Sequence, residues 1–161
     1  LEIAYINHLD DTRYGEGVIS THDKIQVPSL SITKLMDFHS ESWKDKYKTW
    51  KLIIIEEAQF FPDLKEFVLR AVDEDHKKVI VIGLDGDSDR NTFGEILSLI
   101  PYADEYHKLK AICNYCQDGT EAIFTRRIVN SKVQKLVGTL EMYKPVCRYH
   151  FNAKIEDLPE I

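Results

Sequence analysis

Two adjacent carboxylates, Glu56 and Glu57, directly follow the aliphatic run Leu52–Ile55 in the segment KLIIIEEAQFFPD. In proteins that transfer phosphate, a strand that ends in an acid places a carboxylate near the magnesium ion of the bound nucleotide. A second acid beside it can accept the proton of an attacking hydroxyl group. The pair indicates phosphate-transfer chemistry. A strand that simply leaves the core can also end in a charge, and similar acid pairs occur in helicases and other ATPases.

Three cysteines and one histidine form two pairs of equal spacing. Cys113 and Cys116 make a CxxC motif, and Cys147 and His150 repeat its spacing 31 residues later, in CRYH. Four such ligands suit a tetrahedral structural zinc ion. The alternatives are a redox pair or buried thiols at the CxxC motif, with a surface histidine at position 150. An odd number of cysteines argues against a closed disulfide framework and favours a reducing compartment.

Strand-like and helix-like segments alternate and should position these groups. Strands are expected at 1–6, at 52–55 as a strand buried on both faces, at 78–86 and at 106–113. Helices are expected at 31–39, from Asp63 onward with Glu66 completing its cap, and at 93–100, where Pro101 ends the helix. This alternation predicts an open, mainly parallel α/β sheet with ligands beyond the carboxyl ends of its strands. The long polar loop 7–23 is of the kind that is usually functional or mobile.

The composition narrows the class of protein further. The chain has 161 residues, of which 43% are hydrophobic, enough for one domain plus a small appendage. It contains no apolar stretch of the roughly 18 residues that a membrane span needs, so we expect a cytoplasmic protein without a membrane partner. A net charge of -6 disfavours binding to a nucleic acid backbone, whereas a small anionic ligand needs only a local cluster of donors.

Six motifs together resemble one enzyme family. They are DTRYGEGVISTHD, IIIEEAQFFPDL, VIGLDGDSDRNTFGEIL, CNYC, EAIFTRR and MYKPVCRYHF. Their order is similar to that in thymidine kinases of the compact, zinc-containing type, over about residues 1–151. The resemblance implies transfer of the γ-phosphate of ATP to the 5′-hydroxyl of thymidine or deoxyuridine. It also implies Mg²⁺ with ATP, a structural Zn²⁺, a homotetramer or homodimer, and feedback inhibition by dTTP.

The resemblance also implies a domain organisation and roles for single residues. A sheet of the P-loop NTPase, RecA-like type would span 1–112, a zinc-binding lasso closing over the nucleoside 113–151, and a tail 152–161. Glu57 would be the catalytic base, and Cys113, Cys116, Cys147 and His150 the zinc ligands. The residues near magnesium and the phosphates would be Asp11, Arg13, Glu56 and Gln59. The residues contacting the nucleoside would be Phe60, Leu84, Ser88, Phe93, Thr125, Gln134, Lys135, Leu136, Val137, Gly138 and Tyr143.

The sequence departs from the family pattern in several places. The glycine-rich phosphate loop, which the family places before the strand at Leu1, has no counterpart in these residues, and we expect it upstream. A native protein without it would bind nucleoside but not phosphorylate it. Glu56 replaces the usual Asp, which favours contact with magnesium through water. Ser88 replaces an aromatic that stacks on the base, so base packing would fall to the neighbouring apolar residues. His150 replaces a fourth cysteine, a mild change because histidine is an ordinary zinc ligand.

A nucleic-acid-binding zinc knuckle is the main alternative of another class. Basic residues near the cysteines support it, namely Arg126, Arg127, Lys132, Lys135 and Lys144. The acid pair and the net negative charge weigh against it. A helicase or ATPase fragment is a third interpretation, but the chain lacks the length and the further motifs of such a motor.

Overall fold

The computed structural model describes residues 2–11, 15, 17–20, 25–128 and 142–158. The chain divides into two compact units, the first made of Leu1–Asp85 and Thr92–Ala103 and the second of Gly86–Asn91 and Asp104–Ile161. The domain boundary predicted after residue 112 therefore falls inside the second unit. In the described part of the chain, no helix has the length and apolar character that a membrane crossing requires.

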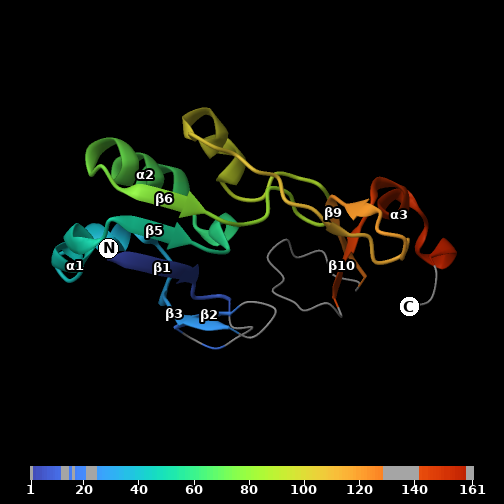
Figure 1. Cartoon of the computed structure of the whole chain (residues 1–161), viewed down its shortest axis with the longest axis horizontal. Coiled ribbons are helices and arrows are strands. Elements are labelled where there is room, and N and C mark those ends of the chain that lie inside the picture. Colours follow the sequence, from blue (N-terminus) through green and yellow to red (C-terminus); the bar gives the residue numbers. More distant parts are fainter. Residues whose placement is uncertain (1, 12–14, 16, 21–24, 129–141, 159–161) are drawn as a thin grey trace. The chain divides into compact units, whose positions relative to one another are not determined.

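A parallel sheet forms the centre of the first unit (Figure 1). Its four strands are β1 (Ile3–His8), β4 (Leu30–Ile32), β5 (Leu52–Ile55) and β6 (Lys78–Val81), in the order β4-β1-β5-β6. The register pairs Ile55 with Ile6 on one side and with Val81 on the other. These strands are rich in β-branched residues, which fit a pleated and buried surface. The predicted mainly parallel α/β sheet is confirmed, and the carboxyl ends of β1, β5 and β6 lie at one edge.

One face of this sheet carries the hydrophobic core of the first unit. Ile6, Ile53 and Ile55 are fully buried there. The core residues that pack with them from the helical segments include Leu35, Phe38, Trp50, Leu64 and Phe67. On the alternate positions, Ile3 and Ile80 remain 38% and 46% exposed. The prediction that the strand at 52–55 is buried on both faces is wrong, because within the described residues the core packs against one face only.

The helical segments of the first unit are short. They are η1 (Leu35–His39), α1 (Lys44–Thr49), η2 (Ala58–Phe60), α2 (Leu64–Leu69), the π-helical η3 (Arg70–Glu74) and η4 (Ile96–Tyr102). The helix expected at 31–39 is in fact the strand β4 followed by the 3-10 helix η1. Strand β2 (Val18–Ser20) lies within the predicted long loop 7–23 and pairs antiparallel with β3 (Gln26–Pro28), which lies beyond it.

Two predicted helix boundaries differ from the structure. The side chain of Asp63 does not cap α2. Its carboxylate instead accepts the backbone N–H groups of Leu35 at 3.2 Å and Met36 at 2.8 Å, which the start of η1 leaves without helical partners. The helix expected from Phe93 begins only at Ile96, after Gly94 in the left-handed region (φ 60°), and includes Pro101 instead of stopping before it.

The second unit is built from small antiparallel pairs. Strand β7 (Ala111–Ile112) pairs with β8 (Glu121–Ala122), and β9 (Phe124–Arg127) pairs with β10 (Tyr143–Val146). Helix α3 (Arg148–Asn152) and η5 (Ile155–Asp157) follow. The predicted strand at 106–113 is wrong for most of its length. Only its last part is extended, and it joins the antiparallel pair and not the parallel sheet, because residues 104–110 are exposed and without a buried face.

A polar cluster closes the amino end of the sheet. The Nζ of Lys77, which is 9% exposed, donates to the carbonyl oxygens of Tyr47 at 2.9 Å and Trp50 at 3.0 Å. The Tyr47 hydroxyl donates to Asp75 at 2.7 Å, and the His39 Nε2 lies 3.5 Å from the same carboxylate. Burial and the Asp75 hydrogen bond raise the pKa of Tyr47. Burial alone would raise the pKa of Asp75, but the hydrogen bond from Tyr47 and the nearby imidazole of His39 outweigh it and lower this pKa.

Removing the Tyr47 hydroxyl should lower the free energy of unfolding. We expect Tyr47→Phe to cost about 1 kcal/mol at neutral pH, because the substitution leaves a partly buried carboxylate without its donor. The pKa of Asp75 is depressed on folding, so this contribution is present above its ordinary value of 3.8 and is lost as the pH falls through the lower folded value. Urea unfolding at several pH values measures the difference. The exposed Tyr106 provides the control Tyr106→Phe, and equal losses in both variants would contradict the assignment.

Candidate active site and metal centre

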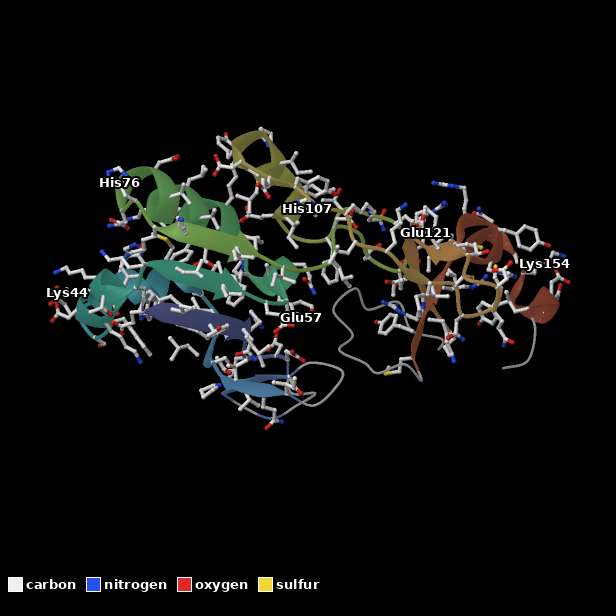
Figure 2. The ribbon with its side chains drawn as sticks, in the orientation of Figure 1. Lys44, Glu57, His76, His107, Glu121 and Lys154 are labelled. Atoms are coloured by element: carbon white, nitrogen blue, oxygen red, sulfur yellow. The ribbon has the colours of Figure 1, made fainter. Side chains whose placement is uncertain are left out.

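The acid pair lies at the carboxyl edge of the parallel sheet, as predicted. The backbone N–H of Glu56 donates to the carbonyl of Ile6 at 2.8 Å, which continues the β1–β5 ladder beyond the strand. Glu57 lies past the end of β5 (Figure 2). Asp11 follows β1 on the same edge, and its N–H donates to the carbonyl of His8 at 3.0 Å. Both glutamates and Asp11 are half-buried, which leaves carboxylates within reach of solvent and ligands.

The backbone of Glu57 is in the left-handed region, with φ 50° and ψ 39°. Non-glycine residues seldom adopt this conformation, and those that do are often found at functional sites. The turn is held because the Glu57 carbonyl accepts the N–H of Phe60 at 3.0 Å and the Ala58 N–H donates to the carbonyl of Ile82 at 3.0 Å. The side-chain Nε2 of Gln59 donates to the Glu57 carboxylate at 2.5 Å. This geometry presents an oriented carboxylate that can take up a proton.

Two of the residues predicted to face a nucleoside form an aromatic pair in the first unit. The rings of Phe60 and Phe93 are 7% and 6% exposed and meet edge to face, 5.6 Å apart. Leu84 is 44% exposed, and its N–H donates to the Gln59 Oε1 at 3.1 Å. The structure therefore brings these three residues to the segment that follows the acid pair. Burial of both rings also fits an ordinary role in the core.

Ser88 lies in the loop 86–91, which belongs to the second unit. The loop is organised by Asp87, which is 8% exposed and accepts the N–H groups of Asp89 and Asn91 at 2.9 Å each. Arg90 has a positive φ of 65°, and its guanidinium lies 4.5 Å from the centre of the Phe151 ring. This cation–π contact joins the loop to the C-terminal part of the same unit.

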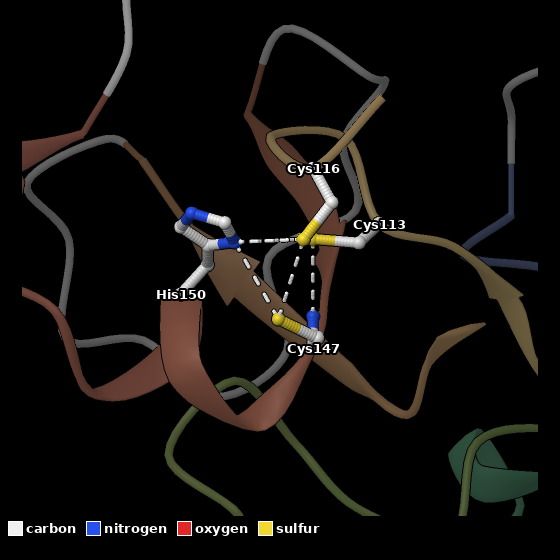
Figure 3. Close-up of side chains that lie close together, drawn as sticks. All are labelled: Cys113, Cys116, Cys147 and His150. Carbon is white, nitrogen blue, oxygen red and sulfur yellow. Dashed lines mark hydrogen bonds between the residues drawn. The ribbon is translucent and has the colours of Figure 1, made fainter. Parts of the chain in front are cut away.

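Cys113, Cys116, Cys147 and His150 converge on one point (Figure 3). Their ligand atoms all lie within 4.8 Å of one another. The Sγ atoms of Cys116 and Cys147 are 3.8 Å apart, and the His150 Nδ1 lies 3.3 to 3.4 Å from the three sulfurs. A tetrahedron with zinc–ligand bonds of about 2.3 Å to sulfur and 2.0 Å to nitrogen has edges of about 3.8 and 3.5 Å. The four residues therefore fit a zinc ion.

The chemistry of the thiols also suits a cation. Burial alone would raise the pKa of Cys113, but backbone N–H donors from Cys147, Tyr115 and Cys116 outweigh it and lower this pKa to about 6. Burial and the neighbouring Cys113 raise the pKa of Cys116 to about 11. One thiolate thus forms easily while its neighbour is held back, and a bound cation would relieve that repulsion. Arg126 adds a positive charge beside the cluster, since its Nη1 donates to the carbonyl of His150.

The structure describes only some of the other residues that were predicted to contact the nucleoside. Thr125 lies in β9 opposite Pro145 of β10, and Tyr143 begins β10 with the Arg127 guanidinium 5.5 Å from its ring. Arg13 and the segment Gln134 to Gly138, with Lys135, Leu136 and Val137, lie outside the described residues, so their predicted contacts remain predictions.

The contacts of three side chains were not predicted from the sequence. The Oδ1 of Asn7 accepts the hydroxyls of Ser29 at 3.0 Å and Ser31 at 2.9 Å, joining β1 to β4 near the acid pair. Gln59, whose predicted place near the phosphates stays a prediction, donates to the Glu57 carboxylate, and the Arg90 guanidinium lies over the Phe151 ring. An isolated polar residue belongs to no hydrophobic repeat and to no spaced motif. Only its position next to a motif could have indicated a role.

The fold and the site define a class: an α/β protein with a parallel sheet that ends in acids and a separate unit with a Cys₃His metal-binding set. The family model for thymidine kinase matches residues 1–151, and the chain belongs to the thymidine kinase family.

The chain is 41% identical over 149 residues to a thymidine kinase of Oryza sativa subsp. japonica, covering 92% of this chain and 54% of that protein. It is 42% identical over 149 residues to thymidine kinase a of Arabidopsis thaliana, covering 92% of this chain and 62% of that protein. The thymidine kinase of Monkeypox virus is 39% identical over 143 residues, 89% of this chain and 76% of the viral protein. The chain thus spans about half to three fifths of the length of its plant relatives.

Zinc should be needed for the order of the second unit but not for the first. Among the described residues, its core cluster buries only Ala122 and Val146 besides two of the cysteines, so the metal must supply much of the stabilisation. We expect Cys147→Ser to bind little zinc and to lose protection from hydrogen exchange in β9 and β10, while β1, β5 and β6 stay protected.

Two histidine variants separate ligation from packing. His150→Cys should keep one zinc per chain, and His150→Ala should keep part of it because water can take the fourth position. The exposed His107 gives the control His107→Ala. Zinc content by mass spectrometry and hydrogen exchange are measured on the same samples. An ordered second unit in metal-free protein would contradict the prediction.

Proposed function

We propose that this chain forms the greater part of a thymidine kinase that transfers the γ-phosphate of ATP to the 5′-hydroxyl of thymidine or deoxyuridine. The observation that carries the proposal is Glu57, which lies at the carboxyl edge of the parallel sheet in a chain of this family. Its carboxylate is half-buried and oriented by the buried amide of Gln59. A carboxylate in that position can accept the hydroxyl proton as the phosphate is transferred.

The phosphate side of the site would be formed by groups at the same edge. Asp11 and Glu56 supply carboxylates there, and Arg13 would offer its planar fork to the charge that develops on the phosphate. Magnesium bound with ATP would neutralise the phosphates and align them. Glu56 reaches farther than an aspartate, which suits contact with this ion through water. A glycine-rich phosphate loop upstream of this chain would complete the site.

We propose as nucleoside contacts the residues that the resemblance implies, each named with the unit to which it belongs. Phe60, Leu84 and Phe93 supply apolar surface from the first unit. From the second unit we propose Ser88, Thr125 and Tyr143, together with the backbone of 134–138. Zinc on Cys113, Cys116, Cys147 and His150 would hold the ends of the segment that covers the base.

The resemblance that identifies the family also supports proposals on the whole protein. We propose a cytoplasmic homotetramer or homodimer that dTTP inhibits as the end product of this salvage route. Size-exclusion chromatography with light scattering measures the oligomeric state, and inhibition kinetics measure the effect of dTTP.

Nucleic acid binding by the metal unit has less support. Arg126 donates to the carbonyl of His150, and Arg127 lies over the ring of Tyr143, so both arginines make contacts inside the unit. A chemical-shift titration with thymidine and with a short oligonucleotide discriminates between the two functions. Shifts with the oligonucleotide alone would favour the nucleic-acid-binding function.

Glu57→Gln should remove activity without removing binding. The amide keeps the size of the side chain but cannot accept the proton, so kcat should fall by about 10²-fold or more. Thymidine affinity should stay within a factor of about two. The assay follows ATP-dependent formation of dTMP in a protein that includes the phosphate loop. The exposed Glu66 in α2 provides the control Glu66→Gln, and near-normal turnover of Glu57→Gln would refute the assignment.

Ser88→Phe should tighten nucleoside binding. An aromatic ring at this position would stack on the pyrimidine, which is worth about 1 kcal/mol beyond the area buried. Isothermal titration calorimetry with thymidine and with deoxyuridine measures the gain, and Ser42→Phe at an exposed position serves as the control. Unchanged or weaker affinity would mean that another residue occupies this wall of the site.

A further inference from the structure

Gln59 is a buried side chain whose amide is engaged at both ends. It lies in η2, two residues after the proposed base, and is only 2% exposed. Its Nε2 donates to the Glu57 Oε2 at 2.5 Å, and its Oε1 accepts the backbone N–H of Leu84 at 3.1 Å. A backbone N–H can only donate and a carboxylate can only accept, so these two partners determine the orientation of the amide.

The surrounding backbone leaves room for this side chain and for little else. A Cβ on Gly83 would come within 2.4 Å of the Gln59 Oε1. A Cβ on Gly94 would come within 2.3 Å of the Gln59 carbonyl oxygen, and Gly94 also has a positive φ of 60°. Two glycines from separate segments therefore approach Gln59 closely. Gly83 packs against the side-chain amide and Gly94 against the backbone of Gln59, so a close-packed environment restricts both the amide and the chain that carries it.

The carboxylate on which Gln59 acts needs an external support. The backbone of Glu57 is left-handed, and its side chain is half-buried at the end of a strand, where several rotamers are open to a glutamate. A charge-assisted bond from a fixed amide selects one of them. The Gln59 amide also accepts a hydrogen bond from the backbone N–H of Leu84, so it links Glu57 to the segment that follows β6.

We propose that Gln59 is a positioning residue that holds the Glu57 carboxylate at the angle needed to accept the proton of the nucleoside hydroxyl. This inference rests on the proposed kinase function, and it assigns Gln59 an action through Glu57 in addition to its predicted place near the phosphates. The proposal also accounts for the position of Gln59, two residues after Glu57 and before the aromatic pair. From there its side chain can point back to the Glu57 carboxylate.

Kinetics of Gln59 variants test the proposal in the protein that carries the phosphate loop. Gln59→Met fills the same space without either hydrogen bond, and kcat should fall about 10- to 100-fold, while the Kd for thymidine changes less than about twofold. Gly83→Ala, which pushes against the amide, should produce the same pattern. Gln59→Glu keeps an acceptor for Leu84 but sets a second carboxylate beside Glu57. The acidic limb of the pH–rate profile of Gln59→Glu should move to higher pH, because the carboxyl groups at positions 57 and 59 then share a proton.

The matched controls are Gln26→Met and Gln26→Glu, at an exposed position in β3. They should leave kcat and the pH profile unchanged. Normal kcat in Gln59→Met, or an equal rise in the Kd for thymidine and loss of kcat, would overturn the positioning role.

A second measurement does not depend on catalysis. The side-chain amide protons of Gln59, assigned by their disappearance in Gln59→Met, should exchange slowly with water and should shift in Glu57→Ala. Fast exchange, or no shift in Glu57→Ala, would overturn the inference even if the protein phosphorylates thymidine. Slow exchange and a shift in a protein without kinase activity would support the hydrogen-bonded pair and refute the proposed function instead.

Discussion

The cost of burying polar groups governs both ends of the parallel sheet. An amide or ammonium group that leaves water without gaining a hydrogen bond costs several kcal/mol, so each buried polar side chain needs partners inside the protein. At the amino end, Lys77 satisfies this need through the last carbonyls around α1. At the carboxyl end, Asn7 and Gln59 are each 2% exposed and bind hydroxyl, carboxylate and backbone groups. At this edge the bond that satisfies the buried amide of Gln59 also contacts the acid Glu57.

The two units meet the requirement for stability by different means. The first unit buries a continuous cluster of aliphatic and aromatic side chains against one face of a sheet. The second unit has short strands and few buried apolar residues in its described part. Its four ligands come from the segment that follows β7 and from α3 with its N-cap residue. A metal ion can replace a hydrophobic core in so small a unit. The stability of the first unit therefore depends on the packing of its apolar side chains, and we expect that of the second to depend on a metal held by the three cysteines and the histidine.

Much of this architecture could be predicted from the sequence, because it depends on periodic or spaced residues. The runs at β1, β5 and β6 indicated parallel strands, and the repeated spacing of Cys113, Cys116, Cys147 and His150 indicated the metal set that the structure brings together. The failures share one cause, which is that tertiary partners outweighed local signals. Asp63 resembles a cap for the helix that follows, but it serves the N–H groups of η1, some 28 residues earlier in the chain. The strand expected at 106–113 has no buried face over residues 104–110. Gln59 contacts Leu84 and lies close to Gly94, both distant from it in the sequence.

If Ser88 contacts the base as proposed, the loop 86–91 would link the metal ligands with the choice of base. Asp87 determines the turn, and Arg90 lies over Phe151, which packs on the cluster that contains Cys113 and Cys147. Ser88, where the family usually has an aromatic, lies between these two anchors in the same loop. The Phe151 ring thus contacts both the cluster that contains the cysteines and the residue Arg90 of this loop, within a single unit. One small core then supports both the metal ligands and the loop that we propose to face the base.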